Sequence, residues 1–352
     1  MKNLLLKSIF YLLPLVLISC GRVSQADIAS SCRYAVYFDL IDDGSDAASV
    51  VIISPYNGSR DTLTIDRPLG NIVCMSTSQV AGLAEIGADS VITAVSGLKY
   101  IMHPELHSRG VADIGYEASL DYERLLALKP DVVLTYTISG AEPQYISKMR
   151  SLGIRVLVLH DHLENHPLAR AEYMRLYGAL TGRQETADSL FAMVCTRYDS
   201  LASGTWKFPE KVKALLNVPY GDAWYVPGGE SYMSRLVSDA GGEILGAEPG
   251  STHSKVISLE QAYGLSQSAD IWLNPGPCRT VEDLVLFHHS FCMFGPVMKG
   301  LPIYNNTLRT TPEGGNDFWE SGSVRPDLVL EDLIAIFRGD AEGDLKYHFK
   351  VE

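Results

Sequence analysis

From Asn71 onward, short apolar runs alternate with segments whose apolar residues recur at helical spacing. The apolar runs are rich in leucine and β-branched residues and show no polar alternation: NIVCM, VITAV, DVVLTY and IRVLVLH. Strands of this kind are typical of a parallel sheet covered on both faces. The helical segments between them are STSQVAGLAEIGA, SLDYERLLALKP and YISKMRSLG. We therefore predict an α/β lobe of Rossmann-like type over residues 71–166.

A second series of the same kind begins at Lys211 and predicts a C-terminal α/β lobe over residues 206–338. Its segments repeat the order of the first series. LDYERLLALKPDVVLTY corresponds to ISLEQAYGLSQSADIWLNP, and SLGIRVLVL corresponds to MKGLPIYNN. Internal repetition indicates two related structural units, each with its own parallel sheet. Residues 339–352 follow as a tail.

Helical periodicity fills the region between the lobes, residues 167–205. Gly182 and Gly204 limit a segment with apolar residues at helical spacing: Ala187, Leu190, Phe191, Val194, Tyr198 and Leu201. A helix of about 20 residues is about 30 Å long, enough to run from one lobe to the other. We expect one long helix to join the lobes stiffly, so that they close on a ligand by only a small angle.

Residues 33–70 precede the first lobe and have a different pattern. YAVYFDL and SVVIISPY, separated by IDDGSDAA, predict a β-hairpin, and DTLTID adds a further strand. This segment is an N-terminal β extension of the two-lobed architecture.

The first twenty residues predict export. Lys2 and Lys7 flank the start of an apolar run that is too short to span a bilayer, which is typical of a secretory signal peptide over residues 1–19. LISC followed by glycine resembles a lipobox, so Cys20 would carry a lipid and residues 20–32 would form a tether. An ordinary signal peptide with an incidental cysteine is the alternative. The lipidated form places the protein in a bacterial cell envelope, in the periplasm or on the outer face of the cytoplasmic membrane.

The net charge limits which kinds of molecule the protein can bind, and the cysteines offer one candidate disulfide. The net charge is −13, and such an acidic surface repels phosphate backbones, so nucleic acid is excluded as a partner. We expect a monomer.

Cys278 and Cys292 are the best candidates for a disulfide in an oxidising compartment, whereas Cys74 and Cys195 sit in apolar contexts typical of core residues.

Motifs of catalysis are missing from the sequence. It contains no GxSxG, HExxH or P-loop motif, and STSQV stands after the first strand where a dinucleotide-binding protein would have GxGxxG. We therefore predict that the protein has no enzymatic activity and no cofactor of its own.

The order of these motifs resembles the substrate-binding proteins of bacterial ABC importers, in the class with a helical backbone. The stretches that carry the resemblance lie between about Asn71 and Phe337: NIVCMSTSQVAGLAEIGADSVITAVSG, GYEASLDYERLLALKPDVVLTY, NVPYGDAWYVPGGESYMSRLVSDAGGE and KVISLEQAYGLSQSADIWLNPG. The resemblance implies a ligand held between the lobes and passed to an ABC permease with its ATPase. The ligands of this class are ferric siderophores and other iron chelates, haem, and cobalamin, a corrinoid.

The resemblance also implies which residues line the cleft, and the rule that open parallel sheets bind ligands beyond the carboxyl ends of their strands points to the same loops. The candidates in the N-terminal lobe are Ser76, Thr77, Tyr100, Tyr116 and Tyr136. Those in the C-terminal lobe are Trp224, Tyr225, His253, Asn274, Arg309 and Trp319. So many aromatic side chains suit a large, flat or ring-bearing ligand.

Glu123 and Glu260 occupy equivalent places in the two repeats, each near the start of a helix. They resemble the paired acidic residues with which the family meets arginines of the permease. Opposite charges at two separated points fix orientation more than affinity. Compensation of the helix dipole explains the same two residues equally simply.

Alternative functions rest on histidines and on the N-terminal extension. His160, His162 and His166 follow a strand end and suggest a site for free zinc or manganese. His253 with Tyr100 or Tyr136 suggests axial ligation of haem iron. A third alternative is an adhesive or structural lipoprotein that uses residues 33–68 as its interaction hairpin.

The stretch NNTLRTTPEGGNDFWESG, residues 305–322, follows the last strand of the second repeat. It is a long loop rich in glycine and asparagine that nevertheless carries Arg309 and Trp319. Loops of this length are often functional. We predict that it forms one wall of the cleft.

Overall fold

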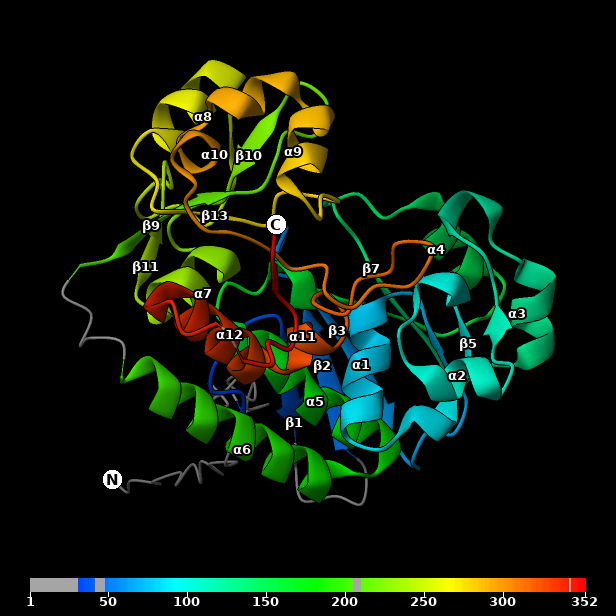
Figure 1. Cartoon of the computed structure of the whole chain (residues 1–352). Helices are drawn as coiled ribbons and strands as arrows, with labels where there is room; N and C mark the ends of the chain where they lie inside the picture. Colours follow the sequence, from blue (N-terminus) through cyan, green and yellow to red (C-terminus); the bar gives the residue numbers. More distant parts are fainter. Residues whose placement is uncertain (1–30, 42–47, 205–209, 342) are drawn as a thin grey trace, which may run out of the picture. The chain divides into compact units, whose positions relative to one another are not determined.

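A computed structural model of the chain describes residues 31–41, 48–204, 210–341 and 343–352 (Figure 1). The predicted signal peptide, the lipidation site Cys20 and most of the predicted tether lie outside the described residues. Within them, no helix combines the length and the apolar composition needed to cross a bilayer.

The N-terminal lobe is the predicted α/β unit. Its strands are parallel and lie in the order β6-β5-β4-β7-β8, where β4 is Ile72–Cys74, β5 Ile92–Val95, β6 Ala112–Asp113, β7 Val132–Tyr136 and β8 Val156–Leu159. The helices around them are α1 (Thr77–Glu85), α2 (Pro104–Ser108), α3 (Tyr122–Leu128) and α4 (Gln144–Ser151), with short 3₁₀ turns at Asp89–Val91, Leu98–Tyr100 and Glu117–Ser119. Side chains of β4 and β7 are buried on both faces, which explains the lack of polar alternation.

The C-terminal lobe repeats this plan with an added edge. Its sheet order is β11-β9-β13-β14-β15, where β9 is Val212–Leu216, β11 Gly242–Ile244, β13 Ile271–Leu273, β14 Ile303–Asn305 and β15 Phe349–Lys350. A separate antiparallel pair is formed by β10 (Trp224–Val226) and β12 (Lys255–Ile257). The helices are α7 (Tyr232–Asp239), α8 (Leu259–Ser266), α9 (Val281–Phe287) and α10 (Gly295–Lys299), with a 3₁₀ segment at His289–Met293.

The segment after Arg338 is not a tail. Strand β15 pairs antiparallel with β14 and completes the edge of the C-terminal sheet. The carboxylate of Asp332 accepts hydrogen bonds from the backbone N–H groups of Lys346 and Tyr347, each at 2.8 Å. The C-terminal lobe therefore extends beyond the predicted boundary at residue 338.

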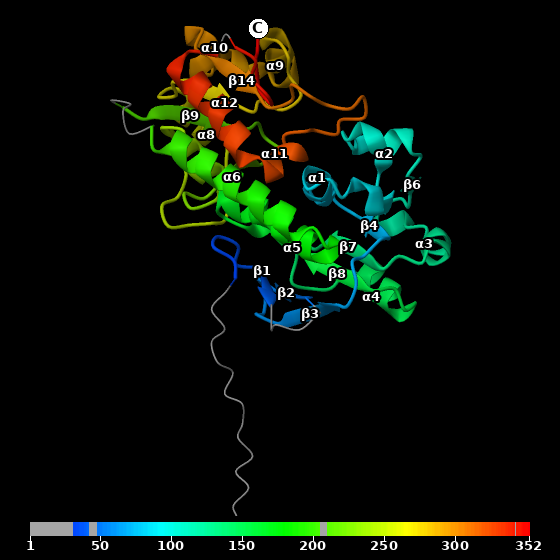
Figure 2. The ribbon, with the colours of Figure 1, turned by 90° about the horizontal axis from the view of Figure 1, so that it is seen from below.

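The region between the lobes forms the predicted long helix and a second helix that precedes it. Helix α5 (Pro167–Thr181) is buried along most of its length, and α6 (Gln184–Ala202) packs against it after a left-handed turn at Gly182. Figures 1 and 2 show α6 running from the N-terminal lobe to the C-terminal lobe. Helix α11 (Ser321–Val324) packs on α1 and α5, and α12 (Pro326–Arg338) packs on α6.

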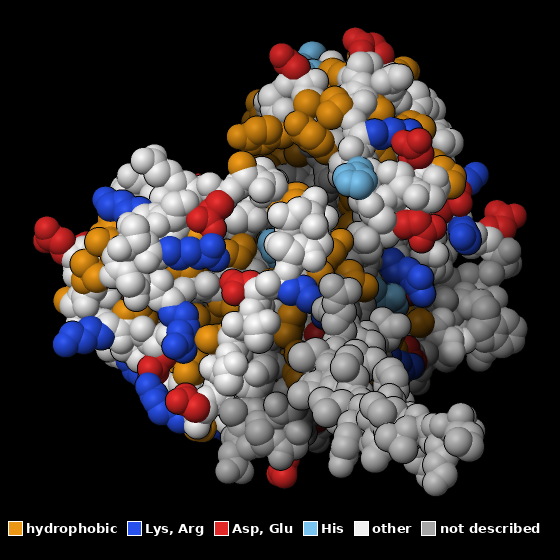
Figure 3. All heavy atoms as spheres, turned by 180° about the vertical axis from the view of Figure 1, so that it is seen from behind, with side chains coloured by type: hydrophobic (Ala, Val, Ile, Leu, Met, Phe, Trp, Pro, Cys, Tyr) orange, Lys and Arg blue, Asp and Glu red, His pale blue; other side chains and the backbone are white. Residues whose placement is uncertain are grey.

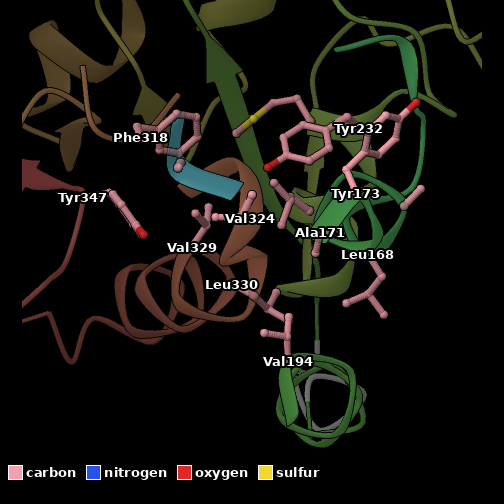
Figure 4. Close-up of a cluster of buried hydrophobic side chains, with 14 of the residues drawn as sticks. Leu168, Ala171, Tyr173, Val194, Tyr232, Phe318, Val324, Val329, Leu330 and Tyr347 are labelled. Atoms are coloured by element: carbon pink, nitrogen blue, oxygen red, sulfur yellow. The ribbon is translucent and has the colours of Figure 1, made fainter. Parts of the chain in front are cut away.

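A continuous hydrophobic core joins the two lobes. One cluster of buried hydrophobic residues runs from the N-terminal sheets through α5 and α6 into the C-terminal lobe. Figure 4 shows part of it where α5, α6, α7 and α12 meet, with Tyr173, Val194, Tyr232 and Leu330 among its members. Opening the lobes widely would expose this apolar surface to water at about 25 cal/mol per Å².

The N-terminal extension is a three-stranded antiparallel sheet, β1-β2-β3, as the pattern predicts. The strands are β1 (Phe38–Ile41), β2 (Ala48–Ile53) and β3 (Arg60–Ile65). Strands β1 and β2 pack on α5.

The predicted disulfide does not form. Cys278 is buried and Cys292 is exposed, and both are free thiols. Burial raises the pKa of the Cys278 thiol.

Candidate ligand-binding cleft

The five candidates of the N-terminal lobe come together around one cavity of about 480 Å³. Ser76, Thr77, Tyr100, Tyr116 and Tyr136 all line it. The cavity opens at the carboxyl ends of β4, β5 and β7, as the rule for parallel sheets predicts. Sequence reasoning missed further members, including Ser96, Glu117 and Tyr145.

Tyr100 and Tyr116 form one side of this cavity. Their rings meet edge to face with centroids 6.0 Å apart. A Cβ atom at Gly97, which has φ +74°, would collide with the hydroxyl of Tyr116, so this position requires glycine. Burial, with Tyr100 as the next cause, raises the pKa of Tyr116 to about 12. Both the packing and the pKa keep Tyr116 a neutral phenol near pH 7.

Tyr136 also lines the cavity, at the end of β7, and β4 separates this strand from β5, which leads to Tyr100. Tyr145 of α4 donates a hydrogen bond of 3.0 Å to the backbone carbonyl of Tyr136. The ring of His162 stands edge to face against Tyr136, with centroids 5.7 Å apart. Burial, followed by the nearby carboxylate of Glu117, raises the pKa of Tyr136. Tyr136 is thus held from two sides and stays protonated.

The loop 305–322 crosses from the C-terminal lobe to the N-terminal lobe. The carboxylate of Glu320 accepts hydrogen bonds from the backbone N–H groups of Met102 and His103, at 2.8 and 3.0 Å. Gly315 lies so close to the carbonyl of Tyr100 that a Cβ atom there would collide with it. The loop is therefore bound to the segment that carries Tyr100. Glu320, which makes the contact, was not among the predicted residues.

Arg309 and Trp319, the predicted ligand contacts in this loop, line two other cavities. Arg309 makes an ion pair with Asp317 and borders a cavity of about 300 Å³ that also involves His103 and Glu320. Trp319 is half exposed and borders a cavity of about 210 Å³ with His162 and Arg170. Trp319 thus faces the junction of the lobes, whereas the charge of Arg309 is already balanced.

Trp224 is a core residue and not a cleft residue. Its side chain is 1% exposed and lies among Trp272, Phe291 and Phe294, with centroids 5.9 to 6.1 Å away. The indole nitrogen donates a hydrogen bond of 3.0 Å to the carbonyl of Leu216. The prediction for Trp224 is therefore wrong, because aromatic residues more than forty positions later in the chain cover it.

The other candidates of the C-terminal lobe line none of these three cavities. Tyr225 is half exposed on β10. His253 is exposed, and its Nδ1 lies 3.3 Å from the hydroxyl of Thr252. Asn274 is buried with φ +57°, and its Oδ1 finds no hydrogen-bond partner among the described residues. The structure does not bring His253 into one cavity with Tyr100 or Tyr136.

Hydrophobic side chains gather around a hollow on the side of the C-terminal lobe that faces the N-terminal lobe, as the space-filling view shows (Figure 3). The exposed large hydrophobic residues of α9 are Leu286, at 84%, and Phe287, at 45%. On the N-terminal lobe, Ile138 in the loop after β7 is also 84% exposed. This apolar surface was not among the features predicted from the sequence.

The histidines of the proposed metal site do not form one. His160 is buried, and burial followed by His162 lowers its pKa to about 4. The Nδ1 of His166 accepts a hydrogen bond from Leu168 and caps α5. Across the described ranges, no group of three His, Cys, Asp or Glu side chains could hold a metal ion.

Glu123 and Glu260 are exposed and occupy equivalent positions in their helices. Each stands two residues after the N-cap, which is Asp121 for α3 and Ser258 for α8. A hydrogen bond with Ser258 lowers the pKa of Glu260. Both side chains therefore present a negative charge to solvent, one from each lobe.

Comparison with known proteins extends this picture. Residues 72–277 match the sequence model of the periplasmic binding proteins. An uncharacterized lipoprotein of Methanocaldococcus jannaschii is 23% identical over 298 residues, which cover 81% of this chain and 69% of the relative.

Solved structures share the fold. A periplasmic haem-binding protein from Pseudomonas aeruginosa is 18% identical, with a TM-score of 0.60 over 81% of this chain and 98% of the other. The periplasmic vitamin B12-binding protein of Vibrio cholerae is 13% identical, with a TM-score of 0.57 over 78% of this chain and 99% of the other. At these identities the likeness concerns the fold.

Proposed function

Because the chain belongs to the periplasmic binding protein family, we propose that it captures a haem, a corrinoid such as cobalamin, or a weakly charged iron chelate, and delivers it to an ABC permease with its ATPase. The observation that carries the proposal is the cavity lined by Tyr100, Tyr116 and Tyr136. Among the residues that the structure describes, no lysine or arginine lines it. Such a site encloses and stacks a ring-bearing ligand and does not grip it by charge.

Charge argues against a strongly anionic ferric siderophore. Such a ligand needs several free arginines or lysines around it. Arg309, the best candidate from the sequence, is paired with Asp317. The guanidinium of Arg170 lies 3.8 Å from the ring centroid of Tyr232, and Lys99 stands over Tyr100 at 5.1 Å. Arg170 and Lys99 are only two cations, fewer than a polyanionic ligand requires.

Apolar surface supplies the affinity. The cavity volume of about 480 Å³ suits part of a large ligand, and Leu286, Phe287 and Ile138 offer exposed apolar contacts beyond it. Burying about 400 Å² of apolar area contributes on the order of 10 kcal/mol before the cost of ordering. Submicromolar binding is within that range. The raised pKa values of Tyr116 and Tyr136 favour stacking and hydrogen bonding by neutral phenols over ligation by a phenolate.

Delivery of the ligand to the permease would depend on two features, the location in the cell envelope and two surface charges. The family and the lipoprotein relative support a place in the cell envelope, where a lipid on Cys20 would hold the protein at the membrane. Glu123 and Glu260 would set its orientation over the permease. The protein performs no chemistry on its cargo in this proposal, and release depends on the ATPase of the importer.

Spectroscopic titration of the mature protein tests the proposal. Hemin, cyanocobalamin, ferrichrome and ferric enterobactin are added separately, and binding is followed by visible absorbance and tryptophan fluorescence. We expect a submicromolar Kd for hemin or cyanocobalamin, and weakening of about tenfold or more for Tyr136→Ala. Tyr220→Ala, at a side chain that is 84% exposed, is the matched control. Tight binding of ferric enterobactin alone would overturn the ligand class, and no binding of any probe would contradict the function.

A further inference from the structure

The N-terminal sheet lies outside residues 72–277 and is locked onto the body of the protein. The buried carboxylate of Glu172 accepts hydrogen bonds from the backbone N–H groups of Arg33, Tyr34 and Ala35, each at 2.8 Å. Glu164, also buried, accepts from Val36 and Tyr37 at 2.9 and 3.0 Å. Buried carboxylates with several such bonds hold a segment in one place. The sheet is therefore an integral part of the lobe and not a module on a tether.

The turn between β2 and β3 reaches from this sheet to the loop that follows β7. The hydroxyl of Tyr56 donates a hydrogen bond of 3.3 Å to the carbonyl of Thr137. The backbone of Gly140 lies against the same side chain, so that a Cβ atom there would stand 3.2 Å from the Cβ of Tyr56. Among the described residues, the side-chain hydrogen bonds of the loop itself are local. Ser139 donates to the carbonyl of Ala141, and the carboxylate of Glu142 accepts from Ser147 and Arg150 of α4. Tyr56 thus supplies support from outside the loop.

The loop after β7 leads directly into the ligand cavity. Thr137 follows Tyr136, which lines that cavity. The rings of Tyr37 and Tyr56 stand edge to face against His160, at 6.3 and 6.1 Å. Two residues later, the ring of His162 contacts Tyr136. The N-terminal sheet therefore supports Tyr136 along two routes, through the loop after β7 and through the turn after β8.

We infer that the N-terminal sheet positions the ligand-binding loop after β7, with Tyr56 as the positioning residue. Residues 137–142 are mostly exposed and form no helix or strand, so they have little to hold them without this contact. The ring of Tyr56 gives the loop a surface to pack on, and its hydroxyl fixes the carbonyl next to Tyr136. The effect on binding rests on the proposed function, whereas the effect on the loop does not.

Hydrogen–deuterium exchange of the ligand-free mature protein tests the effect on the loop. We expect Tyr56→Ala to speed exchange in peptides covering 137–143 by about tenfold or more, without change in the core strands. Tyr56→Phe keeps the ring and should stay within about threefold of wild type. Thr62→Ala, at an exposed position of β3 in the same sheet, should change nothing. Unchanged exchange in Tyr56→Ala overturns the inference.

Binding of hemin and cyanocobalamin to the same variants tests the effect of Tyr56 on ligand binding. We expect Tyr56→Ala to raise the Kd of whichever probe the wild type binds by about tenfold, with Tyr56→Phe and Thr62→Ala near wild type and all melting temperatures similar. Faster exchange with an unchanged Kd would show that the loop does not position the ligand. If the wild type binds none of hemin, cyanocobalamin and ferrichrome, the proposed function fails, and the exchange result still decides the role of Tyr56.

Discussion

The carboxylate of Glu320, in the C-terminal lobe, accepts a hydrogen bond of 2.8 Å from the backbone N–H of Met102, in the N-terminal lobe. Its second oxygen accepts from His103, and Glu320 is 3% exposed. One side chain thus bridges the lobes at the end of the segment that carries Tyr100. The loop that holds it is both a wall of the cleft and a brace between its halves.

Removing this carboxylate should weaken the junction. Glu320→Ala leaves two amide groups without their acceptor, and each buried unpaired group costs about 1–3 kcal/mol when water cannot replace the partner. We expect a loss of about 2 kcal/mol in the free energy of unfolding at pH 6, measured by urea denaturation. Glu313→Ala is the control, because Glu313 is an exposed carboxylate of the same loop. Equal stability of the two variants would show that the bridge contributes nothing.

The same carboxyl should make stability depend on pH. Burial is the main cause that raises the pKa of Glu320 to about 7, from an ordinary value of 4.5. A group with a raised pKa binds its proton more tightly in the folded state, so its contribution is complete below about pH 4.5 and is lost as the pH rises through 7. Glu164 has its pKa raised to about 7 by burial as well and acts in the same direction.

Glu320→Gln isolates this effect, because the amide cannot ionise. We expect the stability of the wild type, relative to Glu320→Gln, to fall steadily from pH 5 to pH 8 in urea denaturation curves. Glu313→Gln should show a constant difference from wild type across the same range. A constant difference for Glu320→Gln would mean that the carboxyl titrates at its ordinary pKa.

Trp224 and Trp319 should respond in opposite ways to replacement by alanine. Trp224 is packed among Trp272, Phe291 and Phe294, and emptying such a site costs about 3–5 kcal/mol of stability. Trp319 is 47% exposed and contacts Phe318 edge to face at 4.6 Å, so we expect a loss of only about 1 kcal/mol. Guanidinium denaturation measures both, and a similar loss in the two variants would contradict the assignment of Trp224 to the core.

Ligand binding separates two roles of Trp319. If its indole faces the ligand, Trp319→Ala weakens the binding of hemin or cyanocobalamin. Unchanged affinity would instead assign Trp319 to bracing the loop.

The N-terminal lobe could be predicted in detail because its strands and the residues that follow them can be recognised from short stretches of sequence. A strand that is buried on both faces is visible as an unbroken apolar run, and the next residues lie at its carboxyl end. Ser76, Thr77 and Tyr136 were identified in this way, and they do line one cavity.

The failures concern contacts between distant parts of the chain. Trp224 stands in a glycine-rich segment that looks like a surface loop, and only packing against Phe291 and Phe294 shows that it is buried. Glu320 stands in a polar loop, and its sequence context does not distinguish it from its neighbours. Its role depends on Met102, which lies 218 residues earlier in the chain. Residues 339–352 have no apolar periodicity, so pairing of β15 with β14 could not be inferred from them.

Glu123 and Glu260 lie outside every cavity that the ligand candidates line. Docking on the permease can therefore be tested separately from ligand binding. Replacing both by glutamine should leave the Kd of the ligand unchanged, since neither charge faces it. Transport should fall by about fivefold or more, because two ion pairs that orient the complex are lost. Uptake of the bound ligand into proteoliposomes with the importer measures this.

Glu282→Gln separates docking from stabilisation of a helix. Glu282 is exposed in the first turn of α9, as Glu260 is in α8. Its charge therefore has the same relation to a helix dipole, but Glu282 is not one of the paired glutamates of the two repeats. It should transport like wild type. A loss in Glu282→Gln equal to that in the double variant would mean that the helix starts, and not the paired charges, account for the effect.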